Sequence, residues 1–235
     1  MELSGKRILV VGGNGAFGAE FGTQLKAAGV SVIGTARSQE SSVRLAADID
    51  ERLLLDLEND ESINRLTNYL ISTPAPLDGI ILSAGLVAFG PIGATPFQVV
   101  ERLTRVNATA QIQLVSALLN KLQESASQSR QPFVLSISGV ISERPMANLA
   151  AYSASKTAIR GYAQAASKEV KKLGITWIDA RPGHTESGLA SRSIFGESPN
   201  LGSGMTVAHV IARMIKALSN DEVDVPSEAF AELDK

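Results

Sequence analysis

Short apolar runs alternate with longer segments of helical periodicity along almost the whole chain. Several of these runs are apolar throughout rather than at every second position, which is typical of strands covered on both faces. They predict strands at residues 7–11, 30–35, 52–56, 77–83, 133–138 and 175–180, with a short last strand at 222–225. The segments between them predict helices at residues 16–28, 60–71, 97–122, 151–173 and 206–218.

This order of elements predicts the fold class. Strands that alternate with helices at this spacing indicate βαβ units and a parallel sheet. Because the chain shows no internal linker and no repeat, we expect residues 1–235 to form a single α/β domain with a doubly wound, Rossmann-like parallel sheet of about seven strands.

A Gly/Ser-rich segment at residues 188–205 interrupts the alternation. It contains two apolar residues, Ile194 and Phe195, in otherwise flexible surroundings. Such residues favour a mobile lid that closes over a substrate. The alternative is a helix that packs its own apolar face.

Composition excludes several classes of protein. The 235 residues are 44% hydrophobic and 20% charged, which suits a soluble globular protein with a sizeable core. The absence of cysteine excludes disulfides and thiolate chemistry, and two histidines argue against a multi-histidine site, so we expect no metal. A net charge of −2 without a basic block gives no sign of a nucleic-acid or membrane partner. The initial apolar run is too short for a signal peptide and no stretch has membrane-spanning length, so we expect a cytoplasmic protein.

A glycine-rich turn, "GGNGAFG", follows the first predicted strand and opens the first predicted helix. Gly13, Gly15 and Gly18 satisfy the G-x-G-x-x-G pattern in this context. Missing side chains let the backbone approach a pyrophosphate, and the helix N-terminus supplies free N–H groups. The turn therefore predicts a dinucleotide site.

The end of the second strand predicts which dinucleotide is bound. NAD sites place Asp or Glu about 20 residues after the turn, but this chain has Ala36 and Arg37 there. A guanidinium binds a 2′-phosphate through charge-assisted hydrogen bonds, whereas a carboxylate would repel it. We therefore expect NADP(H) to be preferred over NAD(H). Asp56, at the end of the third strand, is a candidate partner for the adenine amino group.

Tyr152 and Lys156 lie four residues apart in the predicted helix 151–173, so their side chains share one face. Hydride transfer to a carbonyl requires a proton donor for the oxygen, and tyrosine titrates near pH ~10. A neighbouring ammonium favours the phenolate. We therefore expect Lys156 to lower the pKa of Tyr152, which would then act as a general acid and base.

Over essentially its whole length the chain resembles the short-chain dehydrogenase/reductase family. The resemblance is carried by "GGNGAFG", "LSAG" (82–85), "VN" (106–107), "SISG" (136–139), "YSASK" (152–156) and "RPGHTES" (181–187). It implies a seven-stranded parallel sheet and hydride transfer between NAD(P)H and an alcohol or carbonyl. It also implies that Tyr152 exchanges the proton, Lys156 tunes it and holds the ribose, Asn107 organises a proton-relay water, and a serine bonds the substrate oxygen.

The turn, the strand ends and the resemblance together give the expected cofactor-binding set. It comprises Gly12, Asn14, Gly15, Ala16, Phe17, Gly18, Arg37, Asp56, Leu57, Ser83, Ala84, Gly85, Tyr152, Lys156, Pro182, Gly183 and Thr185. By family habit we also expect a homodimer or homotetramer.

The chain departs from the family pattern at three places. Counted from Gly12, the family's G-x-x-x-G-x-G spacing puts Ala16 at its middle glycine, and "LSAG" replaces Asn-Asn-Ala-Gly. Without gaps, the substrate-binding serine would fall on Gly139. Three alternatives remain: Ser138, which ends a strand at the active edge and is our first choice for a catalytic residue; Ser142; or no functional serine.

We therefore expect an NADP(H)-dependent oxidoreductase that acts on a small carbonyl or secondary alcohol, with Ser138, Tyr152, Lys156 and Asn107 as catalytic residues. The alternative is an NADP(H)-binding sensor or regulatory protein with little turnover. The displaced serine and "LSAG" favour the sensor, and the intact Tyr152/Lys156 pair opposes it.

Overall fold

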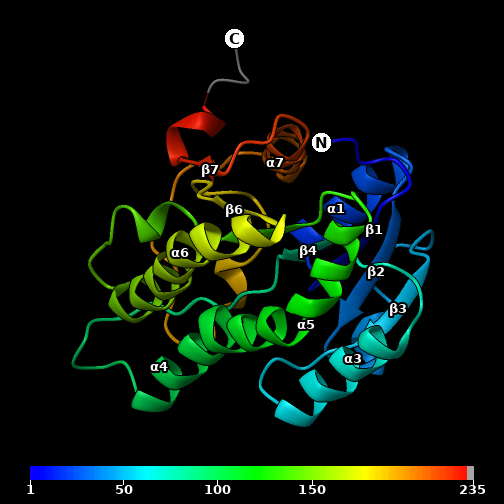
Figure 1. Ribbon diagram of the computed structural model, residues 1–235. Coiled ribbons are helices and arrows are strands. Elements are labelled where there is room, and N and C mark those ends of the chain that lie inside the picture. The colour runs from blue at the N-terminus through cyan, green and yellow to red at the C-terminus, as the bar shows by residue number, and fades with distance from the viewer. Residues whose placement is uncertain (232–235) are drawn as a thin grey trace.

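Seven parallel strands form one central sheet. The computed structural model describes residues 1–231 of the chain. The strand order is β3-β2-β1-β4-β5-β6-β7 (Figure 1), and every neighbouring pair is parallel. The strands are β1 (Arg7–Val11), β2 (Ser31–Ala36), β3 (Glu51–Leu54), β4 (Gly79–Leu82), β5 (Phe133–Ile137), β6 (Thr176–Ala180) and β7 (Asp224–Val225). This confirms the predicted doubly wound, Rossmann-like sheet.

The strand order reverses beside β1. The chain runs outward from β1 to β3, returns to β4 on the other side of β1, and then runs outward to β7. Connections that diverge from neighbouring strands leave a crevice at the carboxyl ends of those strands, where open α/β sheets bind their ligands. The fold thus predisposes the β1/β4 edge to binding.

Helices cover both faces of the sheet, and each layer buries its own core. On one face, Phe21 of α1 and Met214 of α7 pack against β1 and β6 residues such as Ile8 and Ile178. On the other, α3, α5 and α6 form the layer, and all three contribute to a second core. The helices are α1 (Ala16–Ala27), α2 (Gln39–Ser42), α3 (Asp60–Ser72), α4 (Phe97–Thr104), α5 (Ala110–Ser127), α6 (Ala150–Val170) and α7 (Val207–Ser219). No helix within residues 1–231 is long and apolar enough to cross a membrane.

The helix predicted at 97–122 is divided and longer than expected. A π-helical turn, Arg105–Thr109, joins α4 to α5, which continues to Ser127. The last turn of α5 is held by a tertiary contact, because Ser125 Oγ donates to Asp78 Oδ1 at 3.1 Å. Hydrophobic periodicity contains no information about such a contact, so the sequence analysis ended this helix at residue 122 instead of Ser127.

The short helix α2 was missed. Ser38 caps it, since the Ser38 hydroxyl accepts from the Ser41 backbone while the Ser41 side chain accepts from the Ser38 backbone. A helix of four residues is too short to show periodicity, and only the capping serines mark it.

Segment 188–205 is irregular except for a 3₁₀ turn at Ala190–Arg192. The segment is tied to the rest of the molecule near its middle and at its last residue. Ile194 N donates to Val87 O and Phe89 N donates to Phe195 O, each at 2.9 Å. Thr185 forms an isolated parallel bridge with Met205.

Candidate functional site

A cavity of about 470 Å³ opens at the carboxyl edge of the sheet, where the connections that follow β1 and β4 leave in opposite directions. It extends from the β1–α1 turn past the ends of β2 and β3 to α6 and the segment after β6. Of the seventeen expected cofactor-binding residues, sixteen line it: Gly12, Asn14, Gly15, Ala16, Phe17, Arg37, Asp56, Leu57, Ser83, Ala84, Gly85, Tyr152, Lys156, Pro182, Gly183 and Thr185. Gly18 does not. The fold therefore brings together residues from six separate stretches of sequence.

The glycine turn packs too closely for side chains. Gly12 has φ +80°, and a Cβ there would lie 3.0 Å from three atoms of Ala84. A Cβ at Gly18 would lie 2.2 Å from Gly12 O, so Gly18 closes α1 onto the turn instead of facing the cavity. Gly15 is the N-cap of α1, whose first turn carries no acidic residue. The turn therefore presents backbone N–H groups and no opposing charge to an anion.

Charged residues gather at the ends of β2 and β3. Arg37 and Arg44 are exposed and line the cavity. Glu58 lines it as well, but Arg102 Nε and Nη2 each donate to its carboxylate at 2.9 Å. Hydrogen bonds from Arg102 hold the pKa of Glu58 below its usual value. Sequence reasoning missed Arg44, because it follows the unpredicted helix α2.

Tyr152 and Lys156 lie one turn apart near the start of α6 and both line the cavity. Lys156 is only 7% exposed, and its Nζ donates to Ile137 O at 2.7 Å. Burial lowers the pKa of Lys156 to about 8, although the charge of Asp179 works in the opposite direction. The expected pairing of a phenol and an amine in one crevice is therefore present.

The pKa of Tyr152 is shifted in the direction opposite to our prediction. Burial raises it to about 12. The phenol packs on an apolar cluster that contains Ile141 and Leu149, where a phenolate would lose its hydration. The four-residue spacing indicated a nearby cation but not this desolvation, so Tyr152 is a neutral phenol at physiological pH.

Ser138 does not reach the cavity. It is fully buried, and its hydroxyl donates to Asp179 Oδ2 at 2.6 Å. Ser142 is also buried and donates to Ser138 Oγ at 3.2 Å and to Gly139 O at 2.8 Å. Neither serine lines the cavity, whereas Gly139 does. The prediction that Ser138 faces the substrate is wrong, because Ser138 directly follows β5 and its side chain binds a buried carboxylate instead of lining the cavity.

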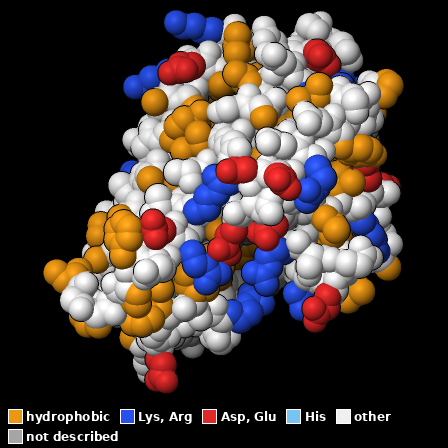
Figure 2. Space-filling model, turned by 90° about the horizontal axis from the view of Figure 1, so that it is seen from below, with side chains coloured by type: hydrophobic (Ala, Val, Ile, Leu, Met, Phe, Trp, Pro, Cys, Tyr) orange, Lys and Arg blue, Asp and Glu red, His pale blue; other side chains and the backbone are white. Residues whose placement is uncertain are grey.

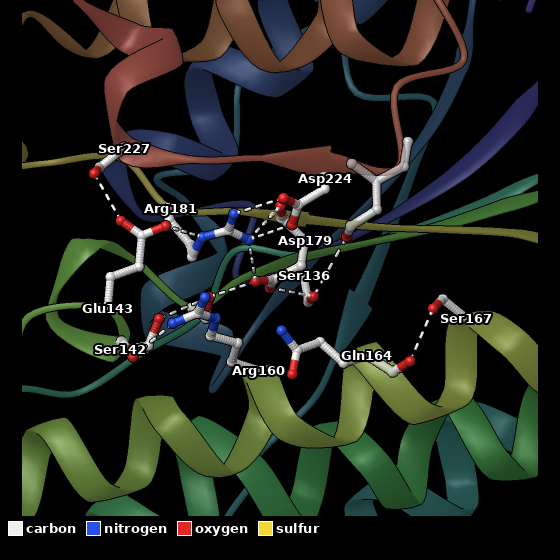
Figure 3. Close-up of polar contacts among 12 residues, drawn as sticks. Ser136, Ser142, Glu143, Arg160, Gln164, Ser167, Asp179, Arg181, Asp224 and Ser227 are labelled. Atoms are coloured by element: carbon white, nitrogen blue, oxygen red, sulfur yellow. Dashed lines mark hydrogen bonds and ion pairs between the residues drawn. The ribbon is translucent and has the colours of Figure 1, made fainter.

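A buried ionic network lies beside these serines (Figure 3). Arg181 Nη1 donates to Asp179 Oδ2 at 3.2 Å and to Asp224 Oδ1 at 2.7 Å, and Arg181 Nε donates to Glu143. Burial raises the pKa of Asp179 despite hydrogen bonds from Ser138, Ser136 and Arg181. Sequence reasoning missed this network. Its only signal was the pair of charges at the end of an otherwise apolar strand, "TWIDAR".

Asn107 lies in the π-helical turn and is fully buried. Its amide nitrogen donates to Leu86 O and Ser155 Oγ, each at 2.9 Å, and its Oδ1 accepts from Leu86 N at 2.8 Å. Asn107 does not line the cavity. It nevertheless comes close to Lys156, since a Cβ on Gly85 would lie 3.3 Å from Asn107 Oδ1 and 3.6 Å from Lys156 Nζ.

The segment after β6 forms the far rim of the cavity. Pro182, Gly183 and Thr185 line it as predicted, and Thr185 Oγ1 donates to Gly183 O at 3.0 Å. His184 lines it too, with its Nε2 3.6 Å from Glu186 Oε1.

A doubly wound sheet with a glycine turn at its reversal point defines the class of dinucleotide-binding α/β proteins. Comparison with known proteins narrows the class: the chain belongs to the short chain dehydrogenase family, whose model matches residues 6–195. Membership of this family indicates an enzyme of the NAD(P)-dependent dehydrogenase/reductase kind.

Two curated relatives cover most of this chain. A dehydrogenase/reductase SDR family protein 7-like of Anopheles gambiae is 24% identical over 242 residues, 95% of this chain and 75% of that protein. A short chain dehydrogenase of Pseudocercospora fijiensis is 25% identical over 198 residues, 81% of this chain and 63% of that protein.

Solved structures share the whole fold. A short-chain dehydrogenase from Streptomyces avermitilis has a TM-score of 0.84 and 25% identity, over 96% of this chain and 90% of that one. A Burkholderia cenocepacia short chain dehydrogenase in complex with NADP has a TM-score of 0.82 and 19% identity, over 97% and 90%. A 3-ketoacyl-(acyl-carrier-protein) reductase from Brucella melitensis complexed with NADH has a TM-score of 0.85 and 17% identity, over 96% and 97%.

Proposed function

We propose that the protein is an NADP(H)-dependent oxidoreductase that interconverts a carbonyl compound and a secondary alcohol. The observation that carries this proposal is that Tyr152 and Lys156 line the same cavity as the glycine turn. A proton donor and a dinucleotide cradle are the two parts that such a reaction needs in one crevice.

The residues present fit a dinucleotide. The backbone from Gly12 to Ala16 would hold the pyrophosphate at the N-terminus of α1, because no side chain at Gly12 or Gly15 blocks the approach. Asp56 and Leu57 would contact the adenine, and Ala84 and Gly85 its ribose. Lys156 and the residues from Pro182 to Thr185 would hold the nicotinamide end.

Two arginines support the preference for NADP(H). Arg37 and Arg44 both line the cavity beyond the end of β2, and neither is engaged in a buried ion pair. The nearby carboxylate of Glu58 is neutralised by its bidentate contact with Arg102. A 2′-phosphate at this place would meet two guanidinium groups. Among the solved structures, complexes with NADP and with NADH both occur, so this preference rests on the arginines.

Bound NADPH would supply a hydride, so that a C–H bond forms at the carbonyl carbon as the C=O π bond breaks and NADPH is oxidised. The substrate oxygen must then take a proton, which Tyr152 donates from its hydroxyl. Because burial holds the phenol neutral, Tyr152 is in the protonated form that reduction requires. Lys156 favours the resulting phenolate when its amine is protonated.

Replacement of Tyr152 by Phe tests this function. Tyr152→Phe should lower kcat by about a thousandfold, because general acid catalysis is lost, and should leave the Kd for NADPH within about twofold. Tyr162→Phe is the matched control, since Tyr162 lies on the same helix but does not line the cavity. NADPH oxidation with a panel of ketones and NADPH titration by fluorescence give the two readouts. Turnover that survives in Tyr152→Phe would refute the proposal, and NADPH binding without turnover by the unmodified protein would favour a sensor.

A further inference from the structure

A small apolar cluster borders Tyr152, separate from the two main cores. Its buried members are Val87, Phe89, Ile141 and Leu149, with Leu189 and Ala190 packed against them. All six line the cavity. These six residues are called the apolar wall below, and Tyr152 packs directly on them.

The apolar wall is assembled from distant segments that are tied together. Val87 and Phe89 follow β4, Ile141 and Leu149 lie between β5 and α6, and Leu189 and Ala190 follow β6. The backbone bonds from Ile194 to Val87 and from Phe89 to Phe195 hold the last segment against the first. Gly196 makes this contact possible, because a Cβ there would lie only 2.0 Å from Phe89 O. The wall is thus a packed surface rather than a row of exposed side chains.

Most of the charged side chains that line the cavity lie away from the apolar wall. Arg37, Arg44, Asp56 and Glu58 follow β2 and β3, at the end away from α6. Lys156 is bound to Ile137 O, and Arg192 is exposed with Nη2 3.3 Å from Ser187 O. Arg192 follows the wall residue Ala190 closely in sequence but is not part of the apolar wall, and none of the six wall residues can form an ion pair with a substrate.

At Gly139, which lines this end of the cavity, the chain lacks the serine hydroxyl that the family pattern places there. It has φ 73° and ψ 162°, a conformation that is essentially restricted to glycine. Space is not the obstacle, since a Cβ there would have Pro182 O as its nearest neighbour at 3.8 Å. The backbone itself therefore opposes a serine at the position where the sequence pattern calls for one.

We propose that the substrate is an uncharged and mainly apolar carbonyl compound, bound with its hydrocarbon body on the apolar wall and its oxygen at the Tyr152 hydroxyl, without a serine hydroxyl. This rests on the proposed oxidoreductase function and names its substrate class. Hydrocarbon gains from burial on such a surface, whereas a carboxylate or phosphate placed on it would lose its hydration and find no ion-pair partner among the six wall residues.

A matched pair of ketones tests the proposal with the unmodified protein. One is an alicyclic ketone with a methyl group at the far end of its ring, and the other carries a carboxylate there. With NADPH, kcat/KM for the methyl ketone should exceed that for the carboxylate ketone by roughly tenfold or more. If neither ketone is turned over, the Kd of each ketone for the NADP⁺-loaded protein is measured by calorimetry. The Kd of the methyl ketone should then be roughly tenfold or more below that of the carboxylate ketone. Equal values, preference for the carboxylate, or binding of neither ketone overturns the inference.

A pair of variants locates the binding surface. Ala190→Asp puts a charge on the apolar wall and should raise the KM, or the Kd, for the methyl ketone by roughly tenfold. Ala94→Asp, an exposed position outside the cavity, should leave both unchanged. NADPH affinity should stay unchanged in both, which also shows that they fold. An unchanged KM and Kd for the methyl ketone in Ala190→Asp would refute the inference about the substrate and leave the proposed function standing. Failure of NADPH to bind the unmodified protein would refute the proposed function.

Discussion

At the residue scale, chemistry here depends on what surrounds each group more than on its sequence neighbours. Tyr152 and Lys156 are adjacent on α6, yet burial moves both toward their neutral forms. Ser138 is next in sequence to Gly139, which lines the cavity, but its hydroxyl donates a hydrogen bond to Asp179 rather than facing the cavity. Residue type and spacing predict which residues are candidates for a site, and the groups that surround each residue in the fold decide its chemical role.

The buried amine of Lys156 makes stability depend on pH. Its pKa is about 8 in the folded protein, against 10.5 for an ordinary lysine, so the unfolded chain binds more protons between these two pH values. Stability therefore rises as the pH increases from 8 to 10.5, by roughly 2.5 kcal/mol from this group. Lys156→Met should remove that rise, which urea unfolding across this pH range measures.

Lys168→Met, an exposed position on the same helix, is the control and should keep the wild-type profile. If the unfolding free energies of Lys156→Met and wild type run parallel from pH 8 to 10.5, the amine is not desolvated as described.

At the element scale, close approaches of backbone set the geometry of the site. The β1–α1 connection works because Gly12 packs on Ala84 and Gly18 packs on Gly12. The π-helical turn between α4 and α5 brings Asn107 against Leu86, next to Gly85. These contacts join elements that are far apart in sequence.

Two glycine-to-alanine changes in helices should have opposite effects. Gly18→Ala forces a Cβ to within 2.2 Å of Gly12 O, and should cost about 1–3 kcal/mol of stability and weaken NADPH binding. Gly161→Ala in α6 has open space around its Cβ, and should stabilise by about 0.5–1 kcal/mol through helix propensity. Urea denaturation and NADPH titration measure both. A Gly18→Ala protein as stable as Gly161→Ala would contradict the described packing.

At the scale of the whole molecule, acidic and basic side chains are mixed across the face shown in Figure 2, which agrees with the net charge of −2. Long-range charge therefore does not select a ligand. In our proposals the cofactor is selected by the local pair of arginines at one end of the cavity, and the substrate by the apolar wall at the other. The cavity contacts so many elements that a bound dinucleotide should stabilise the entire domain.

Ligand-induced stabilisation should reveal the cofactor preference. NADPH at 100 times its Kd adds about 2.7 kcal/mol, which raises Tm by roughly 5–10 °C for a domain of this size. NADH at the same concentration should raise it less. The double variant Arg37→Ala/Arg44→Ala should lose the difference, while Arg65→Ala, an exposed arginine on α3, should retain it. Differential scanning fluorimetry measures these shifts in Tm. Equal Tm shifts with NADPH and NADH in the unmodified protein would remove the case for NADP(H).

The sequence by itself determined the sheet, the glycine turn and the Tyr152/Lys156 pair, because hydrophobic periodicity and short motifs record local geometry. It nominated sixteen residues that the fold then placed around one cavity. Only the tertiary structure decided the direction of the Tyr152 pKa shift, the hydrogen bond from Ser138 to Asp179, the position of Arg44 at the cavity and the assembly of the apolar wall. The physical reason is that desolvation and side-chain pairing depend on residues that are distant in sequence, and no local pattern records which of them will meet.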